Sequence, residues 1–330
     1  MTTIQKMKAI VIKEHGGPEQ LVSVEMDVPK PVFGDVLIRV KAFGINRAET
    51  YMRKGAWGNV APVSGIECVG EVAQDTTGAL PGGAKVTAIM GGLGRTRNGS
   101  YAEYTCAPAT NVVPLKSSLS WADLAAVPES YATAWCCLFD SHHLKPGQVL
   151  LVRGATSALG QAAVNIAAEA GAVVLGTTRG KEKIPLVRSL GAGDVLIEGG
   201  ELGSAIREMY PDGIDCVLDL IGTRTMQDSL KMVKKGGRVV IAGFLGGREP
   251  IQFEVLTGLQ TGADLSFFAS FVLGSKDYPV SKIPLQTMVE KAEKGIYRAK
   301  PANVFNFDQL PDAHRLMEAN QADGKIVVVI

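Results

Sequence analysis

The sequence predicts an α/β protein of two domains, one rich in β-strands and one built on a doubly wound parallel sheet. Residues 1–127 hold short apolar segments separated by Gly and Pro. From residue 149 onward, strand-like runs alternate with helix-like segments, which is the pattern of βαβ units. A turn of small residues at 154–160 follows the first of those runs. The 330 residues suffice for two cores, because single hydrophobic cores stop growing at about 250–300 residues.

The N-terminal region, residues 1–127, is expected to form a compact, barrel-like β unit. Gly and Pro at 16–18 and 81–83 mark turns between its apolar segments. Its strands are expected at 8–13, 36–42, 67–73 and 85–89.

The central region, residues 128–272, is expected to form the parallel sheet. Its strands are expected at 149–152, 173–177, 195–197, 215–219, 238–242 and 265–271, and its helices at 161–170, 181–190, 202–210 and 225–233. Alternation of this kind implies right-handed crossovers between parallel strands.

The final region, residues 273–330, is too sparse in elements for a third domain. Its helices are expected at 284–294 and 311–320, and its strands at 305–307 and 325–330. We therefore expect the chain to return and complete the first domain.

Composition excludes several classes of function. Hydrophobic residues make up 46% and charged residues 20%, the balance of an ordinary globular protein. A net charge of +1 provides no basic field for nucleic acid or an anionic membrane. No stretch reaches the ~20 apolar residues that cross a bilayer, and no apolar run typical of a secretion signal opens the sequence. We expect a soluble, cytoplasmic protein with no nucleic-acid or membrane partner.

The five cysteines are expected to be reduced packing residues, because they are scattered and odd in number. They are Cys68, Cys106, Cys136, Cys137 and Cys216. Zinc ligation needs clustered Cys or His, and no paired spacing is present. His142 and His143 fall in the segment 141–145, where we expect the exposed polar side chains of a loop.

The turn at 154–160 is the strongest functional signal. Backbone N–H groups and the dipole of the following helix bind a pyrophosphate in such a turn. The G-x-G-x-x-G positions hold Ala155, Ser157 and Gly160, so the assignment depends on the strand before the turn and the helix after it. The expected cofactor-binding residues here are Gly154, Ala155, Thr156, Ser157, Ala158, Leu159 and Gly160. The alternative is a structural tight turn that packs helix on strand.

The end of the second strand of the sheet indicates which dinucleotide binds. An NAD enzyme usually carries an acid there for the ribose 2′-hydroxyl. No carboxylate falls at this strand tip, whereas Arg179 and Lys183 suit a 2′-phosphate. NADP(H) is therefore preferred over NAD(H). The alternative is that both residues are solvated charges at a helix start.

A set of ordered motifs runs along the whole chain and resembles one family. These motifs lie at 16–19, 44–49, 99–104, 125–135, 154–160, 190–192, 219–222, 236–238 and 317–327. Together they resemble the zinc-independent quinone oxidoreductase branch of the medium-chain dehydrogenase/reductase superfamily. The chain departs from the usual family pattern at Ser157 and Ala158, where Gly is common, and at 196–199, where many relatives carry a Tyr.

The resemblance implies a GroES-like catalytic domain, a Rossmann domain and a cleft between them that holds the nicotinamide. It also implies a homodimer joined through edge strands of the Rossmann sheets, here the segment 265–271. The cofactor contacts it implies beyond the turn are Thr133, Thr178, Arg179, Lys183, Ile221, Gly243, Phe244, Leu245, Phe268, Phe271 and Lys325.

The same resemblance argues against a catalytic metal. Zinc-dependent relatives bind the ion through a Cys and a His-Glu pair, and the matching positions here hold Asn46, Ile66 and Glu67. Asn is a poor zinc ligand and Ile is none, and the four-cysteine structural lobe is absent as well. We expect no metal site.

Without a metal, the substrate carbonyl must be polarised by hydrogen bonds as hydride arrives. The family pattern assigns Asn46 to the substrate carbonyl, Tyr51 to the developing oxyanion and Arg53 to charge stabilisation. Trp57 matches an aromatic position that covers a flat substrate by stacking. The alternatives are a helix cap for Asn46, core packing for Tyr51 and Trp57, and a solvated charge for Arg53.

The sequence thus predicts an NADPH:quinone oxidoreductase with a small-molecule quinone or related conjugated carbonyl as substrate. One alternative is a reductase of enones or 2-enoyl thioesters, which shares the same hydride geometry. Another is a non-catalytic, crystallin-like protein that binds NADPH.

Overall fold

The computed structural model describes residues 5–200 and 202–330, which divide into two compact units. Unit 1 consists of the described residues up to Glu129 together with Ser270–Gly295 and Ala299–Ile330. Unit 2 consists of Ser130–Ala269 together with Ile296–Arg298. The chain therefore builds unit 1 from its two ends and unit 2 from its middle.

Unit 1 is built on antiparallel strands. A two-stranded sheet pairs β1 (Lys6–Ile12) with β2 (Leu21–Asp27). A seven-stranded sheet has the order β14-β15-β3-β4-β5-β7, with β6 also paired to β3. Its strands are β3 (Asp35–Ile45), β4 (Glu67–Asp75), β5 (Lys85–Ile89), β6 (Tyr104–Pro108), β7 (Val112–Pro114), β14 (Asn303–Asn306) and β15 (Ile326–Val329).

The C-terminal segment completes the sheet of unit 1. Strand β15 lies antiparallel to β3, with Ile326 opposite Ile45, and parallel to β14. The helices of this unit are α1 (Arg47–Arg53), α2 (Trp121–Ala125), α9 (Leu285–Glu293) and α10 (Leu310–Glu318). Helix α10 contacts β3, β14 and β15, so the returning segment closes the core.

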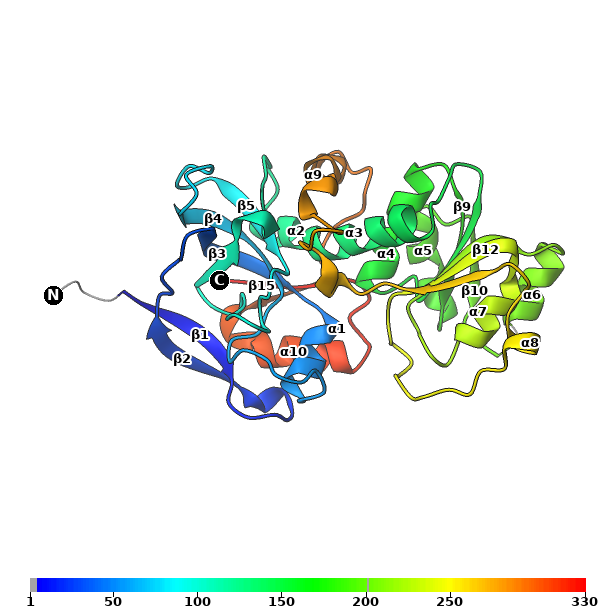
Figure 1. Ribbon diagram of the computed structural model, residues 1–330, viewed down its shortest axis with the longest axis horizontal. Helices are drawn as coiled ribbons and strands as arrows, with labels where there is room; N and C mark the ends of the chain where they lie inside the picture. Colours follow the sequence, from blue (N-terminus) through cyan, green and yellow to red (C-terminus); the bar gives the residue numbers. More distant parts are fainter. Residues whose placement is uncertain (1–4, 201) are drawn as a thin grey trace. The chain divides into compact units, whose positions relative to one another are not determined.

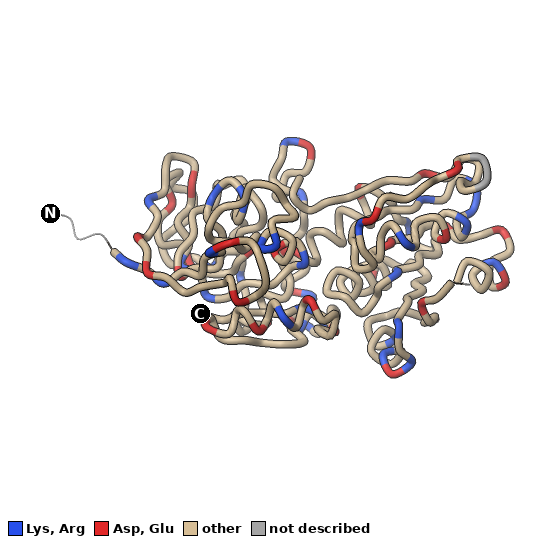
Figure 2. Tube along the Cα trace, turned by 90° about the horizontal axis from the view of Figure 1, so that it is seen from below, with Lys and Arg blue, Asp and Glu red and all other residues tan. Residues whose placement is uncertain are grey.

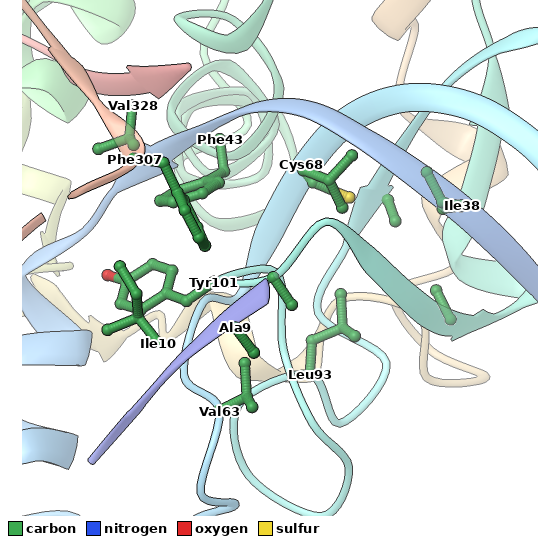
Figure 3. Close-up of a cluster of buried hydrophobic side chains, with 14 of the residues drawn as sticks. Ala9, Ile10, Ile38, Phe43, Val63, Cys68, Leu93, Tyr101, Phe307 and Val328 are labelled. Atoms are coloured by element: carbon green, nitrogen blue, oxygen red, sulfur yellow. The ribbon is translucent and has the colours of Figure 1, made fainter. Parts of the chain in front are cut away.

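The core of unit 1 is centred on three aromatic rings (Figure 3). The centroids of Phe43 and Tyr101 are 4.9 Å apart, and Phe307 meets Phe43 edge to face at 6.4 Å. Offset and edge-to-face arrangements are those that aromatic quadrupoles favour. Because Phe43 lies on β3 and Phe307 follows β14, these contacts join the N-terminal and C-terminal parts of the chain.

Unit 2 is a parallel six-stranded sheet with the order β10-β9-β8-β11-β12-β13. Its strands are β8 (Val149–Arg153), β9 (Val173–Thr178), β10 (Asp194–Ile197), β11 (Ile214–Asp219), β12 (Val233–Ile241) and β13 (Asp264–Phe267). Its helices are α4 (Ala158–Glu169), α5 (Ile184–Ser189), α6 (Leu202–Met209), α7 (Met226–Met232) and α8 (Val255–Gly258), and α3 (Pro128–Trp135) leads into it.

Figure 1 shows the helices of unit 2 packed around its sheet. Helix α4 contacts β8 and β9, α5 contacts β9 and β10, and α7 contacts β11 and β12. This is the doubly wound arrangement that the strand–helix alternation predicts.

Two predictions about local structure are wrong. The strand expected at 265–271 ends at Phe267, and a 3-10 helix (Ser270–Val272) follows where the chain re-enters unit 1. The sequence predicts His142 in an exposed loop, but it is 0% exposed. The reason is that a π-helix (Cys136–Ser141) forms where a loop was expected, and the His142 N–H continues its hydrogen bonding by donating to the carbonyl of Cys137. His143 is exposed.

Charges of both signs are interspersed along the chain in each unit (Figure 2). Across residues 5–200 and 202–330, no helix is both long enough and apolar enough to span a bilayer. All five cysteines are free thiols, and four of them are buried. Burial raises the pKa of Cys68 and Cys216 to about 12, so both stay protonated and pack as small apolar groups.

Candidate functional site

The carboxyl ends of β8 and β11 mark the point where the strand order of unit 2 reverses. From β8 the chain proceeds outward through β9 and β10, and it then crosses to β11 and continues through β12 and β13. Ligands of open α/β sheets bind outside the carboxyl ends of strands at such a switch point. The turn at 154–160 begins here, directly after β8.

The turn is held by Ser157 and two glycines. Gly154 has a φ of +81°, a conformation that favours glycine. The Ser157 hydroxyl donates to the Gly154 carbonyl at 2.9 Å and accepts from the Gly160 N–H at 3.1 Å, which caps α4. A Cβ built on Gly160 would lie 2.3 Å from the Gly154 carbonyl oxygen, so only glycine allows this approach of helix to strand.

The other residues of the turn differ in exposure. Ala155 is fully buried, whereas Thr156, Ala158 and Leu159 are partly exposed. Helix α4 spans Ala158–Glu169, long enough for a full helix dipole, and its first N–H groups lack helical acceptors. The arrangement fits the pyrophosphate of a dinucleotide.

The ends of β11 and β12 lie beside this turn. A Cβ on Gly154 would lie 3.3 Å from Leu245 Cδ1 and 3.9 Å from Ile221 Cγ1. A Cβ on Gly243 would lie 2.6 Å from the Leu220 carbonyl oxygen, so this glycine lets β11 and β12 approach closely at their ends. The structure therefore brings together Gly154, Ile221, Gly243 and Leu245, which sequence reasoning assigned to one ligand.

The end of β9 carries the two basic residues expected at the 2′-phosphate. Thr178 is buried and its hydroxyl donates to the Gly180 carbonyl, Arg179 is exposed, and Lys183 is half-buried in the turn that follows. Gly180 lies under the Glu182 carboxylate, since a Cβ there would lie 2.0 Å from Glu182 Oε1. The prediction from the sequence considered only the end of the strand and did not take the Glu182 carboxylate into account.

A buried network of charged side chains lies beside the turn, and it was not predicted from the sequence. Arg153, the last residue of β8, is 1% exposed and bonds to Glu198 and to Asp228, the latter at 2.8 Å. Thr177 Oγ1 donates to Glu198 at 2.8 Å and accepts from the Gly154 N–H at 3.0 Å. The signal was present, because a buried arginine at the end of an apolar run requires acidic partners.

The remaining expected cofactor contacts are scattered. Thr133 is buried on α3, and Phe268 is buried directly after β13. The Phe244 ring lies 5.8 Å from that of Phe267. Phe271 belongs to unit 1, where the Arg95 guanidinium lies 5.4 Å from its ring centroid. Their contact with a cofactor stays a prediction.

Unit 1 contains a second polar cluster, centred on Asn46. Asn46 Nδ2 donates to Glu67 Oε1 at 2.9 Å, and its Oδ1 accepts from the Lys325 ammonium at 2.7 Å. Lys325 also donates to Glu67 Oε1 at 2.5 Å, and its Nζ lies 3.9 Å from Glu129 Oε2. The Lys325 side chain is 3% exposed and that of Glu67 is 1% exposed. Asn46, Glu67 and Glu129 all belong to unit 1, and the contact of Lys325 with a cofactor stays a prediction.

Asn46 is the N-cap residue of α1 and forms a capping box with Glu49, so the helix-cap alternative for its role is borne out. Its side chain is bound to Glu67 and Lys325 as well. The Glu49 carboxylate accepts from the Asn46 N–H at 2.6 Å, which is the reciprocal hydrogen bond of the capping box. It also accepts from the Ile66 N–H at 2.9 Å. Glu49 therefore links α1 both to Asn46 and to Ile66, the residue before Glu67, and so it positions Asn46 and Glu67 relative to each other.

Glu49 ends a buried hydrogen-bonded chain. Arg53 Nε donates to His314 Nδ1, so the hydrogen of His314 is on Nε2, which donates to the Tyr101 hydroxyl at 2.9 Å. Tyr101 in turn bonds to Glu49. Burial raises the pKa of Glu49 to about 7 and lowers that of His314 to about 3. His314 is neutral at physiological pH.

The structure corrects the role expected for Arg53. This residue is 0% exposed, and its guanidinium bonds to the Glu318 carboxylate and to the Gly16 carbonyl, the latter at 2.5 Å. Arg53 therefore joins α1 to α10, and no face of it is left to stabilise a substrate charge. The solvated-charge alternative is equally wrong.

Tyr51 and Trp57 are both half-buried. Tyr51 lies on α1, five residues after Asn46, and Trp57 lies in the turns that follow this helix. Their contact with a substrate stays a prediction.

The donor set around Asn46 does not fit a zinc ion. Zinc sites use Cys, His and carboxylate ligands, whereas the Lys325 ammonium already binds Asn46 Oδ1 and Glu67 Oε1, and Glu67 Oε2 accepts from the Glu129 N–H. In the described part of the chain, no three Cys, His, Asp or Glu side chains form a metal-binding group.

Comparison with known proteins identifies related families. The model of the alcohol dehydrogenase GroES-like domain matches residues 33–117, and that of the zinc-binding dehydrogenase matches residues 158–284. A quinone oxidoreductase of Mus musculus is 34% identical over 257 residues, which cover 74% of this chain and 76% of the mouse protein.

Two solved structures share the fold. An NAD-dependent alcohol dehydrogenase is 27% identical with a TM-score of 0.85, over 98% of this chain and all of that one. A mycobacterial protein solved in complex with NADPH is 24% identical with a TM-score of 0.87, again over 98% of this chain and all of the other.

Proposed function

The chain belongs to the quinone oxidoreductase branch of the medium-chain dehydrogenase/reductase superfamily, and on this premise we propose that it is an NADPH-dependent, zinc-independent quinone reductase. It is an oxidoreductase enzyme. The observation that carries the proposal is the glycine-lined turn at the switch point of the unit 2 sheet, closed by Ser157 at the start of α4.

The residues of unit 2 suit NADPH. The N–H groups at the start of α4 hold the pyrophosphate, and Arg179 and Lys183 bind the 2′-phosphate. The NADPH complex of the mycobacterial relative supports this choice. NADPH, when bound, supplies the hydride.

The residues of unit 1 suit a carbonyl substrate. Asn46 Nδ2 uses one hydrogen on Glu67, and no described residue accepts the other, which donates to the substrate oxygen. The Tyr51 hydroxyl donates to the same developing charge, and Trp57 covers the flat ring. A quinone needs little further activation, since water can protonate its hydroquinone oxygens. Zinc is not required, because the ammonium of Lys325 lies where a cation would bind Asn46 and Glu67.

The experiment is a measurement of NADPH oxidation against ortho-quinones, para-quinones and enones, with NADH as the control. We expect quinones to be reduced with NADPH, NADH to be a poor substitute, and chelator treatment to leave the rate unchanged. Turnover of enones alone would replace the quinone assignment with an alkene reductase. Loss of activity on chelation would contradict zinc independence.

The Tyr51→Phe variant tests the proposed oxyanion donor. Removal of its hydroxyl should lower kcat about 10- to 100-fold and change the KM for NADPH little, because the hydrogen bond strengthens in the transition state. Steady-state kinetics decide the outcome, and an unchanged kcat would remove Tyr51 from the mechanism.

A further inference from the structure

The sheet of unit 1 places a lysine directly against the proposed substrate donor. Ile326 of β15 lies opposite Ile45 of β3, so the preceding residue, Lys325, falls beside Asn46. Glu67 opens the neighbouring strand β4. Three strands thus bring an ammonium, a carboxylate and an amide together at one place.

Space for the ammonium is provided by Gly44. A Cβ at this position would lie 2.2 Å from Lys325 Cε and 2.5 Å from Glu67 Oε1. Any other residue on β3 here would displace the pair. Glycine at this position therefore leaves the room that the buried Lys325–Glu67 pair occupies.

The two charges fix the direction of the Asn46 amide. An ammonium can only donate and a carboxylate can only accept, so Oδ1 must face Lys325 and Nδ2 must face Glu67. The contact with the Lys325 ammonium pulls electron density toward Oδ1 and strengthens the remaining N–H as a donor.

The ammonium keeps its charge despite burial. Desolvation by itself lowers the pKa of Lys325, but the carboxylates of Glu67 and Glu129 outweigh it and raise the pKa above its usual value. A permanent positive charge therefore lies 2.7 Å from the amide oxygen of Asn46.

We propose that Lys325, paired with Glu67, is a positioning residue that orients and polarises the Asn46 amide toward the substrate oxygen, an inference that rests on the proposed reductase function. Lys325 does not touch the substrate. It acts through Asn46, and it provides the fixed positive charge of this site.

The kinetic test is a double-mutant cycle between Lys325→Met and Asn46→Leu. Lys325→Met keeps the length of the side chain and should lower kcat about 10- to 100-fold with the KM for NADPH unchanged. In the Asn46→Leu background, the same change should lower kcat no further, because the residue through which Lys325 acts is gone. Additive losses would overturn the proposal.

A charge-neutral double variant separates this role from stability. Lys325→Met alone leaves a buried, unpaired carboxylate and destabilises unit 1. Lys325→Met with Glu67→Gln removes both charges and should recover the melting temperature while kcat stays low. Recovery of both the melting temperature and kcat would show that the Lys325–Glu67 pair has only a structural role. Lys41→Met, in the partly exposed Lys41–Glu71 pair between β3 and β4, is the matched control and should change neither quantity.

A spectroscopic test does not depend on activity. With 15N-asparagine labelling, the Asn46 side-chain amide is identified by its loss in Asn46→Leu. Lys325→Met should shift this signal and accelerate its hydrogen exchange, and an unchanged signal would refute the orienting role. A wild-type protein that reduces no quinone or enone would refute the proposed function instead, while this signal still decides the role of Lys325.

Discussion

Arg179 carries the proposed choice of NADPH over NADH. It is exposed at the carboxyl end of β9, and charge-assisted hydrogen bonds of this kind contribute about 1.5–3 kcal/mol. Arg179→Asp should therefore raise the Kd for NADPH about 10- to 100-fold and leave that for NADH nearly unchanged. Calorimetric titration with both nucleotides measures this.

The matched control is Arg188→Asp, which makes the same charge change at the exposed end of α5. Its affinity for NADPH should stay close to that of the wild type. If the Kd of Arg179→Asp for NADPH also stays close to that of the wild type, Arg179 is a solvated charge and does not bind the 2′-phosphate.

His142 makes the stability of the protein sensitive to acid. Its ring is fully buried, neither ring nitrogen has a hydrogen-bond partner among the described residues, and burial lowers its pKa to about 3. The folded state therefore keeps this ring neutral, whereas the unfolded chain binds a proton as the pH falls through about 6.5. The contribution of His142 to stability is therefore full above pH 6.5 and is lost as the pH falls toward 3.

His142→Leu should remove this pH dependence and the cost of two unpaired nitrogens. From the shifted pKa, His142 alone accounts for a loss of about 2 kcal/mol in the free energy of unfolding between pH 8 and pH 5. Chemical denaturation at both pH values should give a smaller loss in the variant. His143→Gln, at the exposed neighbour, serves as control, and an equal acid loss in all three proteins would contradict the assignment.

At the scale of elements, the contact between β8 and α4 depends on Gly160. Gly160→Ala would place a Cβ 2.3 Å from the Gly154 carbonyl and 2.8 Å from Ala155 Cα, both backbone atoms that cannot rotate away. The helix must shift, so we expect the Kd for NADPH to rise at least about 10-fold, since binding depends on that helix terminus.

Gly199→Ala is the corresponding control. Gly199 is exposed and follows β10, and a Cβ added there would have no atom within 4 Å. NADPH affinity should be the same as in the wild type. If Gly160→Ala also binds NADPH normally, the turn is only a packing feature.

Much of the fold was predictable because local pattern and tertiary packing agree. Strands β8, β9 and β11 are short apolar runs between helix-like segments, and all form where the alternation predicts them. Strand β13 forms as predicted, but its predicted end at residue 271 was wrong, because apolar residues continue past Phe267 after the ladder with β12 has ended. Hydropathy alone does not reveal where a strand loses its partner.

The site was predictable where it depends on short motifs. The turn at 154–160 follows from sequence context, whereas the Arg153–Glu198 pair joins the ends of two strands 45 residues apart. Arg53 was misassigned for the same reason, because its partner Glu318 lies 265 residues away on α10. Long-range ion pairs leave no periodic pattern in the sequence.

At the scale of the whole molecule, we expect a homodimer joined through β13. This strand lies at the edge of the unit 2 sheet, and Leu265 and Phe267 are 41% and 57% exposed. Exposed apolar edge strands favour pairing with another chain. Analytical ultracentrifugation should give about twice the monomer mass of 34.9 kDa. Leu265→Lys with Phe267→Lys should give the monomer, and a monomeric wild type would contradict the assembly.

The central claim is that unit 2 binds a phosphate-bearing dinucleotide at its switch point. A crystal structure of the chain grown with NADPH tests it most directly. The account predicts the pyrophosphate against the N–H groups of residues 154–160 and the 2′-phosphate between Arg179 and Lys183. A nucleotide bound elsewhere, or a turn left empty at saturating NADPH, would contradict it.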